Sequence, residues 1–447
     1  MEMMRTAGRL LCLIAFVSLL SQFGKTLLGM AHAPNIIPPL RDGLLLLLVL
    51  FAISRTDVFK ARGFYLWALL CIAAISATVF VAAFDDRHIP GLYYARIYLL
   101  PLLFAVALEG IVLRASDDDV RALLRMSFWC GLLVVFTAFG IFAAVELSPR
   151  LLRTLMGDDT GTGPLASAWY IAGGTWLRMG LPATGPNSLG LALGLYALLV
   201  GGVLFSRKPR PVPSAVVVAA LVLALLAVAL TFSRSSWLAI MLGTAALVLA
   251  CVPGGVLFSP ANLTRMVLAG AVSVALMGVA LLLLDSYSDG AVSRWALLNF
   301  SGTDPSMVGH HKSFVIAIES LDDYAWLGYP KGTVGARAAL FGGTLYNVEN
   351  SFLAVFFDMG LPLGSLFMLS IAGMLSGLWV HRSQWSVLIG FTVCAFFLPY
   401  NFEPDIVVFF LFVFTLLGRF MQGHAAVFAP PRAPSLYQST LATHELA

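Results

Sequence analysis

The chain has 447 residues, of which 60% are hydrophobic and 11% are charged, and its mean hydropathy is +0.90. About a quarter of the residues of an ordinary soluble protein are charged, so this composition excludes that class. The formal net charge of +4 is too small to indicate a nucleic-acid partner. All five cysteines lie inside apolar runs, and no Cys/His spacing indicates a metal site. We therefore expect a membrane protein without a disulfide framework, metal or other cofactor.

Long, continuous apolar runs predict membrane-spanning helices, because a strand barrel would show alternating residues instead. The predicted fold is all-α and polytopic, with one transmembrane domain over 1–420 and an unstructured cytoplasmic tail over 421–447. About twelve spans are predicted, at 8–24, 36–54, 63–84, 92–113, 124–146, 184–206, 213–232, 235–253, 263–285, 361–380, 384–400 and 403–420.

The first span has an alternative interpretation as a signal peptide, because Ala31-His32-Ala33 has the small-x-small form of a cleavage site. Residues 22–30, however, separate this site from the apolar run. Cleavage would also leave eleven spans and break the charge alternation described next. We therefore favour an uncleaved first span.

Basic residues recur at every second connector, and the positive-inside rule places such connectors in the cytoplasm. They are Arg55, Lys60, Arg62, Arg114, Arg121, Arg125, Arg207, Lys208, Arg210, His381 and Arg382, together with Arg5 and Arg9 before the first span. Both termini are then cytoplasmic. In a bacterial inner membrane the segments 147–183 and 286–360 become periplasmic loops.

The longest apolar tract, about 216–251, is roughly twice the length of one span and must fold as a hairpin. Its only polar place to turn is Ser233-Arg234-Ser235-Ser236, so we expect Arg234 at the outer membrane surface. Arg178, in the first periplasmic loop, precedes the next span by a few residues. Guanidinium groups at such depths suit phosphate or pyrophosphate. The alternative is that each arginine merely snorkels to the headgroups.

The second periplasmic loop, between spans 9 and 10, contains the other candidate site residues. Helical spacing of apolar residues over 314–321 predicts a short helix lying against the membrane. His310, His311 and Lys312 open it and are either further phosphate contacts or solvated. Glu349 is either a general base or an acid in a first helical turn that Asn347 or Asn350 caps.

Taken in order, these pieces resemble the bacterial O-antigen ligase and O-antigen polymerase superfamily of membrane glycosyltransferases. The matching pieces are Arg178, Gly180 and Pro186-Asn187, then Ser233-Arg234, then Glu349-Asn350-Ser351-Phe352-Leu353, and finally Gly360-Leu361-Pro362-Leu363-Gly364. The motifs cover roughly 176–364. Each is short, so the resemblance depends on their order along the chain and on their shared location on one side of the membrane.

Two departures from the family pattern bear on the activity. Glu349 stands where the family often has histidine, and His310 stands where the loop helix usually opens with arginine. Ligases are expected to keep the histidine, so the glutamate favours a polymerase of O-antigen or exopolysaccharide over a ligase. A carboxylate can accept a hydroxyl proton as imidazole does.

The resemblance implies metal-independent, inverting glycosyl transfer on the periplasmic face. The donor would be an oligosaccharide on undecaprenyl pyrophosphate, held by Arg178 and Arg234, with Glu349 as the catalytic base. His310, His311, Lys312 and Asn350 are candidates for further substrate contacts. The acceptor would be another glycan in a polymerase or lipid A–core in a ligase, and a chain-length regulator is a further candidate partner.

Two hypotheses from other classes fit the span count equally well. A transporter or flippase for lipid-linked glycan would place ionisable residues near the middle of the spans and would tolerate Glu349→Gln. A membrane scaffold would tolerate the loss of either arginine.

Overall fold

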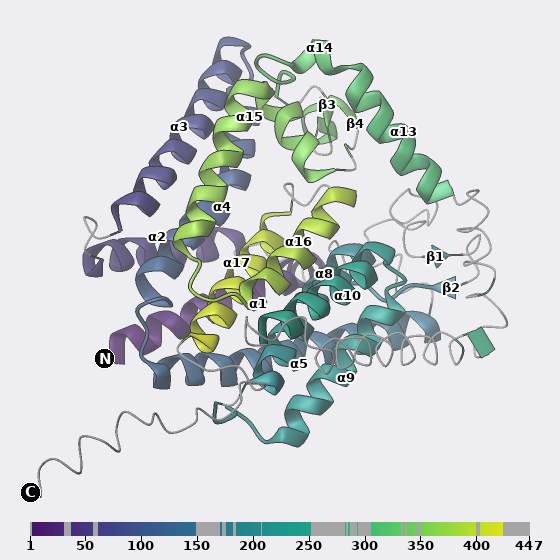
Figure 1. Ribbon diagram of the computed structural model, residues 1–447. Coiled ribbons are helices and arrows are strands. Elements are labelled where there is room, and N and C mark those ends of the chain that lie inside the picture. Colours follow the sequence, from purple (N-terminus) through teal and green to yellow (C-terminus); the bar gives the residue numbers. More distant parts are fainter. Residues whose placement is uncertain are drawn as a thin grey trace, which may run out of the picture.

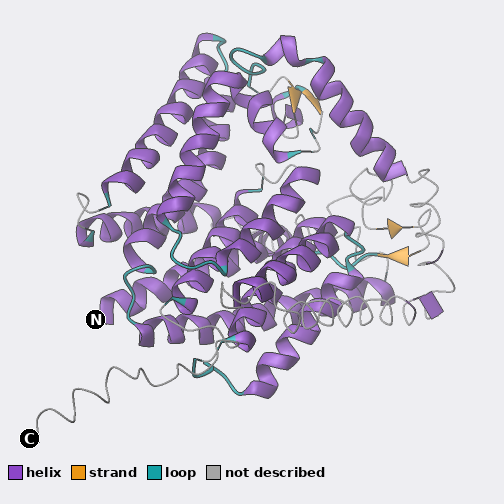
Figure 2. Ribbon diagram, in the orientation of Figure 1, coloured by secondary structure: helices purple, strands orange, loops and turns teal. Residues whose placement is uncertain are grey.

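The computed structural model is a bundle of helices (Figures 1 and 2). It describes residues 2–30, 37–56, 61–148, 170–171, 176–181, 185–206, 208–251, 282, 285–286, 293, 305–331, 334–335, 338–345, 348, 350–398 and 403–422. Within these residues, eight helices are long and apolar enough to cross a membrane, and two shorter apolar helices accompany them. A multi-pass α-helical membrane protein is therefore confirmed at this level. The predicted ninth span lies almost wholly outside the described residues.

The helices follow the predicted spans closely. They are α1 (Glu2–Met30), α2 (Ile37–Arg55), α3 (Arg62–Phe84), α4 (His88–Ile111), α5 (Asp117–Leu147), α8 (Gly185–Phe205), α9 (Ser214–Leu230), α10 (Arg234–Cys251), α13 (Pro305–Glu319), α14 (Leu321–Tyr324), α15 (Ser351–Gly377), α16 (Gln384–Phe397) and α17 (Pro404–Met421). Two-residue strands pair as β1 (Tyr170–Ile171) with β2 (Trp176–Leu177) and β3 (Val334–Gly335) with β4 (Thr344–Leu345), and η2 (Ala338–Phe341) is a 3₁₀ turn.

The centre of the bundle is formed by α4, α8 and α17, which are buried on nearly all sides. These helices are apolar all round, as expected of helices surrounded by other helices. By contrast, α3 lies at the periphery against α15 and exposes large side chains such as Leu69 and Phe80 (Figure 1). In a membrane protein this outward apolar surface faces lipid.

One end of the bundle, here called the ion-pair end, is marked by salt bridges between helix termini. Arg5 at the start of α1 pairs with Asp119 at the start of α5 at 2.8 Å, and Arg419 near the end of α17 pairs with Asp117 at 3.1 Å. The first and last described helices therefore have their outer termini at one end. This agrees with the prediction that both chain termini lie on the same side of the membrane. That this side is the cytoplasm stays a prediction.

The opposite end carries the turn between α9 and α10 and is here called the turn end. Arg125 near the start of α5 donates a hydrogen bond of 3.0 Å to the carbonyl of Pro211, just before α9, so α9 starts at the ion-pair end. Its last residues must then lie at the other end. Glu109, near the end of α4, pairs with Arg114, which lies beside the ion-pair end, so α4 ends there and begins at the turn end. Because α3 leads directly into α4, α3 ends at the turn end.

Candidate functional site

The predicted hairpin turn exists, and its serines explain how it is built. The chain leaves α9 at Leu230 and enters α10 at Arg234. Ser233 caps the new helix, because its Oγ accepts hydrogen bonds from the amide of Ser236 at 3.4 Å and the hydroxyl of Ser236 at 2.8 Å. Phe232 takes a positive φ of 50°, which lets the chain reverse within a few residues. Arg234 is the half-buried first residue of α10.

Arg178 is docked on this turn. Its Nε donates to the carbonyl of Thr231 at 2.8 Å, and its Nη2 donates to Oδ1 of Asn187 at 2.6 Å. The amide of Met179 also donates to the carbonyl of Leu230 at 2.8 Å. The segment 176–181 therefore lies along the end of α9. The structure thus places the two predicted pyrophosphate-binding arginines at one turn, because Arg178 is bonded to a residue three positions before Arg234.

The start of α8 closes against the same turn. A Cβ at Gly190 would lie 2.7 Å from Oγ of Ser236 and 2.9 Å from Oγ1 of Thr231, so glycine is what lets α8 approach so closely. The hydroxyl oxygen of Ser236 also lies 3.4 Å from the carbonyl oxygen of Asn187. The Pro186-Asn187 start of α8 and the Ser233-Arg234 turn between α9 and α10 are therefore packed against each other.

The segment that contains Asn350 reaches the level of this turn through its contact with α16. Gly243 of α10 lies against the carbonyl of Ser386, and Gly390 lies against the carbonyl of Ala239, which sets an antiparallel register between α10 and α16. Extending this register by five residues brings Arg234 level with Ala395.

Asn350 is joined to that same end of α16. Its Nδ2 donates to the carbonyl of Phe396 at 2.8 Å, and Ser351 Oγ donates to that of Leu398 at 2.5 Å. Its Oδ1 accepts from the amides of Phe352 and Leu353, both at 2.9 Å, so Asn350 is the N-cap of α15. Glu349 itself lies outside the described residues, but its neighbour is fixed beside α16 at the height of the turn.

A loop helix is present, but α13 begins at Pro305 and ends at Glu319, so the prediction that residues 310–312 open it was wrong: they lie within it. His311 and Lys312 are exposed on it, and the side chain of His310 lies outside the described residues. Among the described hydrogen bonds, none joins His311 or Lys312 to the turn. Figure 1 shows α13 running along one side of the molecule. Their role as substrate contacts therefore stays a prediction.

A polar cluster that the sequence analysis missed lies where α15 breaks. Lys331 is buried and donates to the backbone carbonyl of Asp358, which α15 presents just before the non-helical Gly360. Tyr98 of α4 donates to Oδ2 of Asp358 at 2.5 Å, and the Lys331 amine lies over the ring of Tyr94 at 5.6 Å. Burial lowers the pKa of Lys331 from its ordinary 10.5, although the nearby Asp358 carboxylate opposes this. The only sign of this cluster in the sequence was one charged residue in each of two apolar stretches, namely Lys331 and Asp358.

The break itself is a close crossing of two backbones. Gly360 has φ of 74° and a Cβ there would lie 2.4 Å from the carbonyl oxygen of Trp326; Gly328 has φ of 75° and would meet the carbonyl of Asp358 at 2.4 Å. Leu361 donates its amide to the carbonyl of Ala325 at 2.7 Å. Glycine is required at both positions, because a side chain at either would collide with main chain.

Other charges at the turn end are paired with each other. Arg41 of α2 contacts both Asp42, at 3.0 Å, and Asp405 of α17, while Arg96 of α4 binds Asp42 at 2.7 Å. Two guanidinium groups and two carboxylates leave this cluster without net charge.

Within the described part of the chain, no group of three or more His, Cys, Asp or Glu side chains is placed to hold a metal ion. No protein-family model, curated protein or solved structure matches the chain.

Proposed function

We propose that this chain transfers a glycan from a lipid-linked pyrophosphate to an acceptor hydroxyl at the periplasmic membrane interface, and that it polymerises O-antigen or exopolysaccharide repeat units. The observation that carries the proposal is the docking of Arg178 on the turn that presents Arg234. Two arginines from different parts of the chain lie at one helix turn, at the end opposite the ion pairs, and the guanidinium of Arg178 is bonded to that turn. Snorkelling alone requires no such convergence.

The chemistry follows from this geometry. Arg178 and Arg234 hold the donor pyrophosphate and stabilise the negative charge that develops as the bond between the anomeric carbon and the phosphate oxygen breaks. Their partial burial strengthens this interaction, because less water screens it. Asn187 and the carbonyl of Thr231 orient the Arg178 guanidinium.

Glu349 supplies the base in this proposal. Its carboxylate takes the proton of the acceptor hydroxyl, whose oxygen attacks the anomeric carbon from the face opposite the leaving group. One C–O bond forms and one breaks, the configuration inverts, and the polyprenyl pyrophosphate leaves with its electron pair. The proton on Glu349 then passes to water.

A ligase is the second candidate within this chemistry, and it differs only in using lipid A–core as the acceptor. A flippase is less well supported, because the described Arg178 and Arg234 lie at a helix end, where an ion or headgroup is met at the interface.

The test is glycan chain length in cells that produce Arg178→Ala, Arg234→Ala or Glu349→Gln at normal membrane abundance. We expect each to accumulate single lipid-linked repeats, with polymerisation rates lowered on the order of 100-fold or more, as for loss of one charge-stabilising donor. Arg210→Ala is the matched control, because this exposed arginine lies between α8 and α9, at the ion-pair end, and should leave polymer normal.

The other outcomes separate the alternatives. Full-length polymer that is not attached to lipid A–core would identify a ligase. Normal, attached polymer in all three variants would contradict glycosyl transfer at this site.

A further inference from the structure

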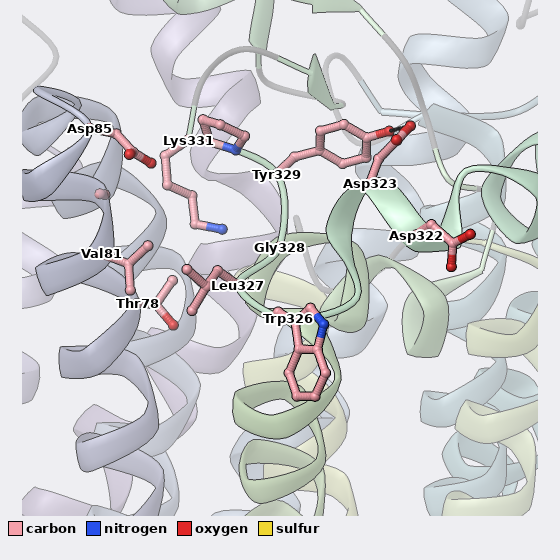
Figure 3. Close-up of a pocket in the computed structure, with 12 residues that line it drawn as sticks. Thr78, Val81, Asp85, Asp322, Asp323, Trp326, Leu327, Gly328, Tyr329 and Lys331 are labelled. Atoms are coloured by element: carbon pink, nitrogen blue, oxygen red, sulfur yellow. Dashed lines mark hydrogen bonds between the residues drawn. The ribbon is translucent and has the colours of Figure 1, made fainter.

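A pocket of about 300 Å³ lies at the turn end, between the last turns of α3 and the segment 322–331 (Figure 3). Figure 3 shows the amine of Lys331 turned to α15, where it donates to the carbonyl of Asp358, and the indole of Trp326 pointing away from it. The polar side chains of the pocket therefore do not converge on a common ligand. Cationic groups without acceptors lie instead at the ion-pair end, beside the connector between α8 and α9.

Lys208, in that connector, is a buried lysine whose amine has no acceptor. The residue is 9% exposed, and its amine lies 5.4 Å from the ring centre of Phe420 in α17. Its backbone amide donates to Oγ of Ser206 at 3.0 Å, but among the described hydrogen bonds none involves the side-chain amine. An ammonium has three N–H donors, and burying it without acceptors costs free energy. The described protein therefore leaves these donors unsatisfied.

The charges that act on Lys208 leave a positive surplus. Arg419 pairs with Asp117 at 3.1 Å, and Arg121 pairs with Asp118. Among the described ion pairs, none includes Lys208. Three cations against two carboxylates leave one positive charge in excess. A phosphodiester carries one negative charge and would balance it.

The pKa of Lys208 reflects these surroundings. Burial lowers it from its ordinary 10.5, and the positive charges of Arg419 and Arg121 lower it further, whereas Asp117 opposes them. An anion in contact with the amine would favour its charged form. The arrangement thus holds a cation that the protein itself does not fully stabilise.

Arg419, the residue before Phe420, carries a second donor without an acceptor. Its Nη2 donates to the carbonyl of Ala115 at 2.7 Å, and its Nη1 contacts Asp117. Its Nε is covered by protein and has no acceptor among the described residues. Because Arg419 acts electrostatically on Lys208, the two sets of unused donors belong to one site at the end of α17.

The connector that carries Lys208 is held in position. Prolines at 209, 211 and 213 restrict its backbone, and Arg125 of α5 donates to the carbonyl of Pro211 at 3.0 Å. Such preorganisation lowers the entropy that binding must offset. Both α8 and α17 end beside this connector, so Lys208 lies at the depth where helices leave the membrane.

We propose that Lys208 and Arg419 form a binding site for the phosphate group of an anionic phospholipid in the leaflet at the ion-pair end. A basic site between transmembrane helices at headgroup depth is typical of lipid phosphate recognition. The bound lipid links the connector between α8 and α9 to the end of α17. This site is independent of the proposed glycosyl transfer, because Arg178 and Arg234 lie at the other end of the bundle.

The test is thermal unfolding of the purified full-length protein in mixed micelles that contain phosphatidylglycerol or phosphatidylcholine. We expect phosphatidylglycerol to raise the unfolding temperature more than phosphatidylcholine does, and Lys208→Met to abolish that difference. In phosphatidylcholine, Lys208→Met should be at least as stable as the wild-type protein, because methionine keeps an apolar side chain over Phe420 without a buried amine. Lys208→Arg keeps the positive charge and should retain the effect of phosphatidylglycerol.

Native mass spectrometry measures the binding itself. Lys208→Met should weaken phosphatidylglycerol binding about tenfold, as for loss of one charge-assisted hydrogen bond. Arg210→Met is the matched control, because it removes the same charge from an exposed position of the same connector and should bind the lipid as the wild-type protein does.

Three results would overturn the site. Equal stabilisation of the wild-type protein by the two lipids would show that the headgroup charge is not recognised. Equal losses in Lys208→Met and Arg210→Met would indicate diffuse attraction to a charged surface. Equal stabilisation by inorganic phosphate without phosphatidylglycerol would assign the site to a free anion instead of a lipid.

Discussion

At the scale of single residues, Asn350 shows how one side chain can serve two helices. Its Oδ1 receives the first amides of α15, and its Nδ2 ties that helix to the carbonyl of Phe396 on α16. The sequence predicted both a possible cap and a possible substrate contact at this position. Local residue pattern could not choose between them, because the choice depends on α16, which lies about 45 residues further along the chain.

Replacing Asn350 by alanine removes the cap and the bond to α16. We expect the free energy of unfolding to fall by about 1–2 kcal/mol, the usual cost of losing an N-cap. Asn350→Asp keeps the Oδ1 acceptor and should recover most of that loss. Thermal unfolding in detergent measures both. An alanine variant with unchanged stability and abolished transfer would instead assign Asn350 to the substrate.

Lys331 makes stability depend on alkaline pH. Its pKa is lowered in the folded chain, so between that value and about 10.5 the unfolded chain binds more protons than the folded one. Stability contributed through this group therefore rises with pH in that window. Compared with Lys331→Met, the wild-type protein should gain unfolding free energy as the pH is raised from 8 to 10. A difference that stays constant or shrinks over this range would contradict the burial of a lowered-pKa amine.

At the scale of elements, the hairpin of α9 and α10 followed from length alone, because a tract of two span lengths has to turn at its polar residues. What length could not reveal is the register between helices. Gly190 fits under Ser236 and Gly243 fits against Ser386, but nothing in either helix's own sequence identifies its partner. Arg178 and Arg234 are therefore brought together by packing that hydropathy does not encode.

Gly190→Ala tests this packing. A methyl group 2.7 Å from Ser236 Oγ must push α8 away from the turn, and we expect a cost of about 1–3 kcal/mol in unfolding free energy, as for other overpacked sites. Transfer activity should fall with it. Gly140→Ala on α5 is the control, since no atom lies within 4 Å of the new Cβ and alanine favours helix by up to about 1 kcal/mol. Equal behaviour of the two variants in unfolding and activity assays would argue against a tightly packed α8.

The start of α15 shows what hydropathy leaves out. The apolar span was predicted from 361, and the part of α15 after its break at Gly360 begins there, but a further helical part before the break begins at Ser351. A hydropathy window starts where continuous apolar residues start, but Asn350 caps the chain earlier. The 27 residues of α15 exceed the roughly 20 that cross a hydrocarbon core of about 30 Å, and the break separates off the first nine. The part before the break therefore belongs to the interface.

At the scale of the whole molecule, hydropathy and the spacing of basic connectors predicted the helices and their alternation. They say nothing about which helices occupy the middle. That α4, α8 and α17 are enclosed while α3 is peripheral follows from side-chain packing among sequence-distant helices. The pocket between α3 and 322–331 was unpredictable for the same reason.

Sidedness can be checked with single cysteines at exposed positions of the two ends. Asp322→Cys lies in the segment before α15, and Asp118→Cys lies at the ion-pair end, where its side chain is 72% exposed. In intact spheroplasts a membrane-impermeant maleimide should label the cysteine at 322 and should reach the one at 118 only after permeabilisation. The unsubstituted protein sets the background, because its cysteines are buried or partly buried. The reverse labelling pattern would invert the orientation.

The crossing at Gly360 also constrains how the protein is made. The backbone groups that complete the break in α15 come from residues 325–331, which leave the ribosome before α15 does. If 286–360 is a periplasmic loop, as predicted, that stretch is translocated before α15 enters the bilayer. Until the two meet, polar main-chain groups such as the amide of Leu361 lack their partners near lipid. On the predicted orientation we expect assembly of α15 to depend on prior export of 325–331, and a chain interrupted between 331 and 350 should assemble more readily than one whose 325–331 segment is deleted.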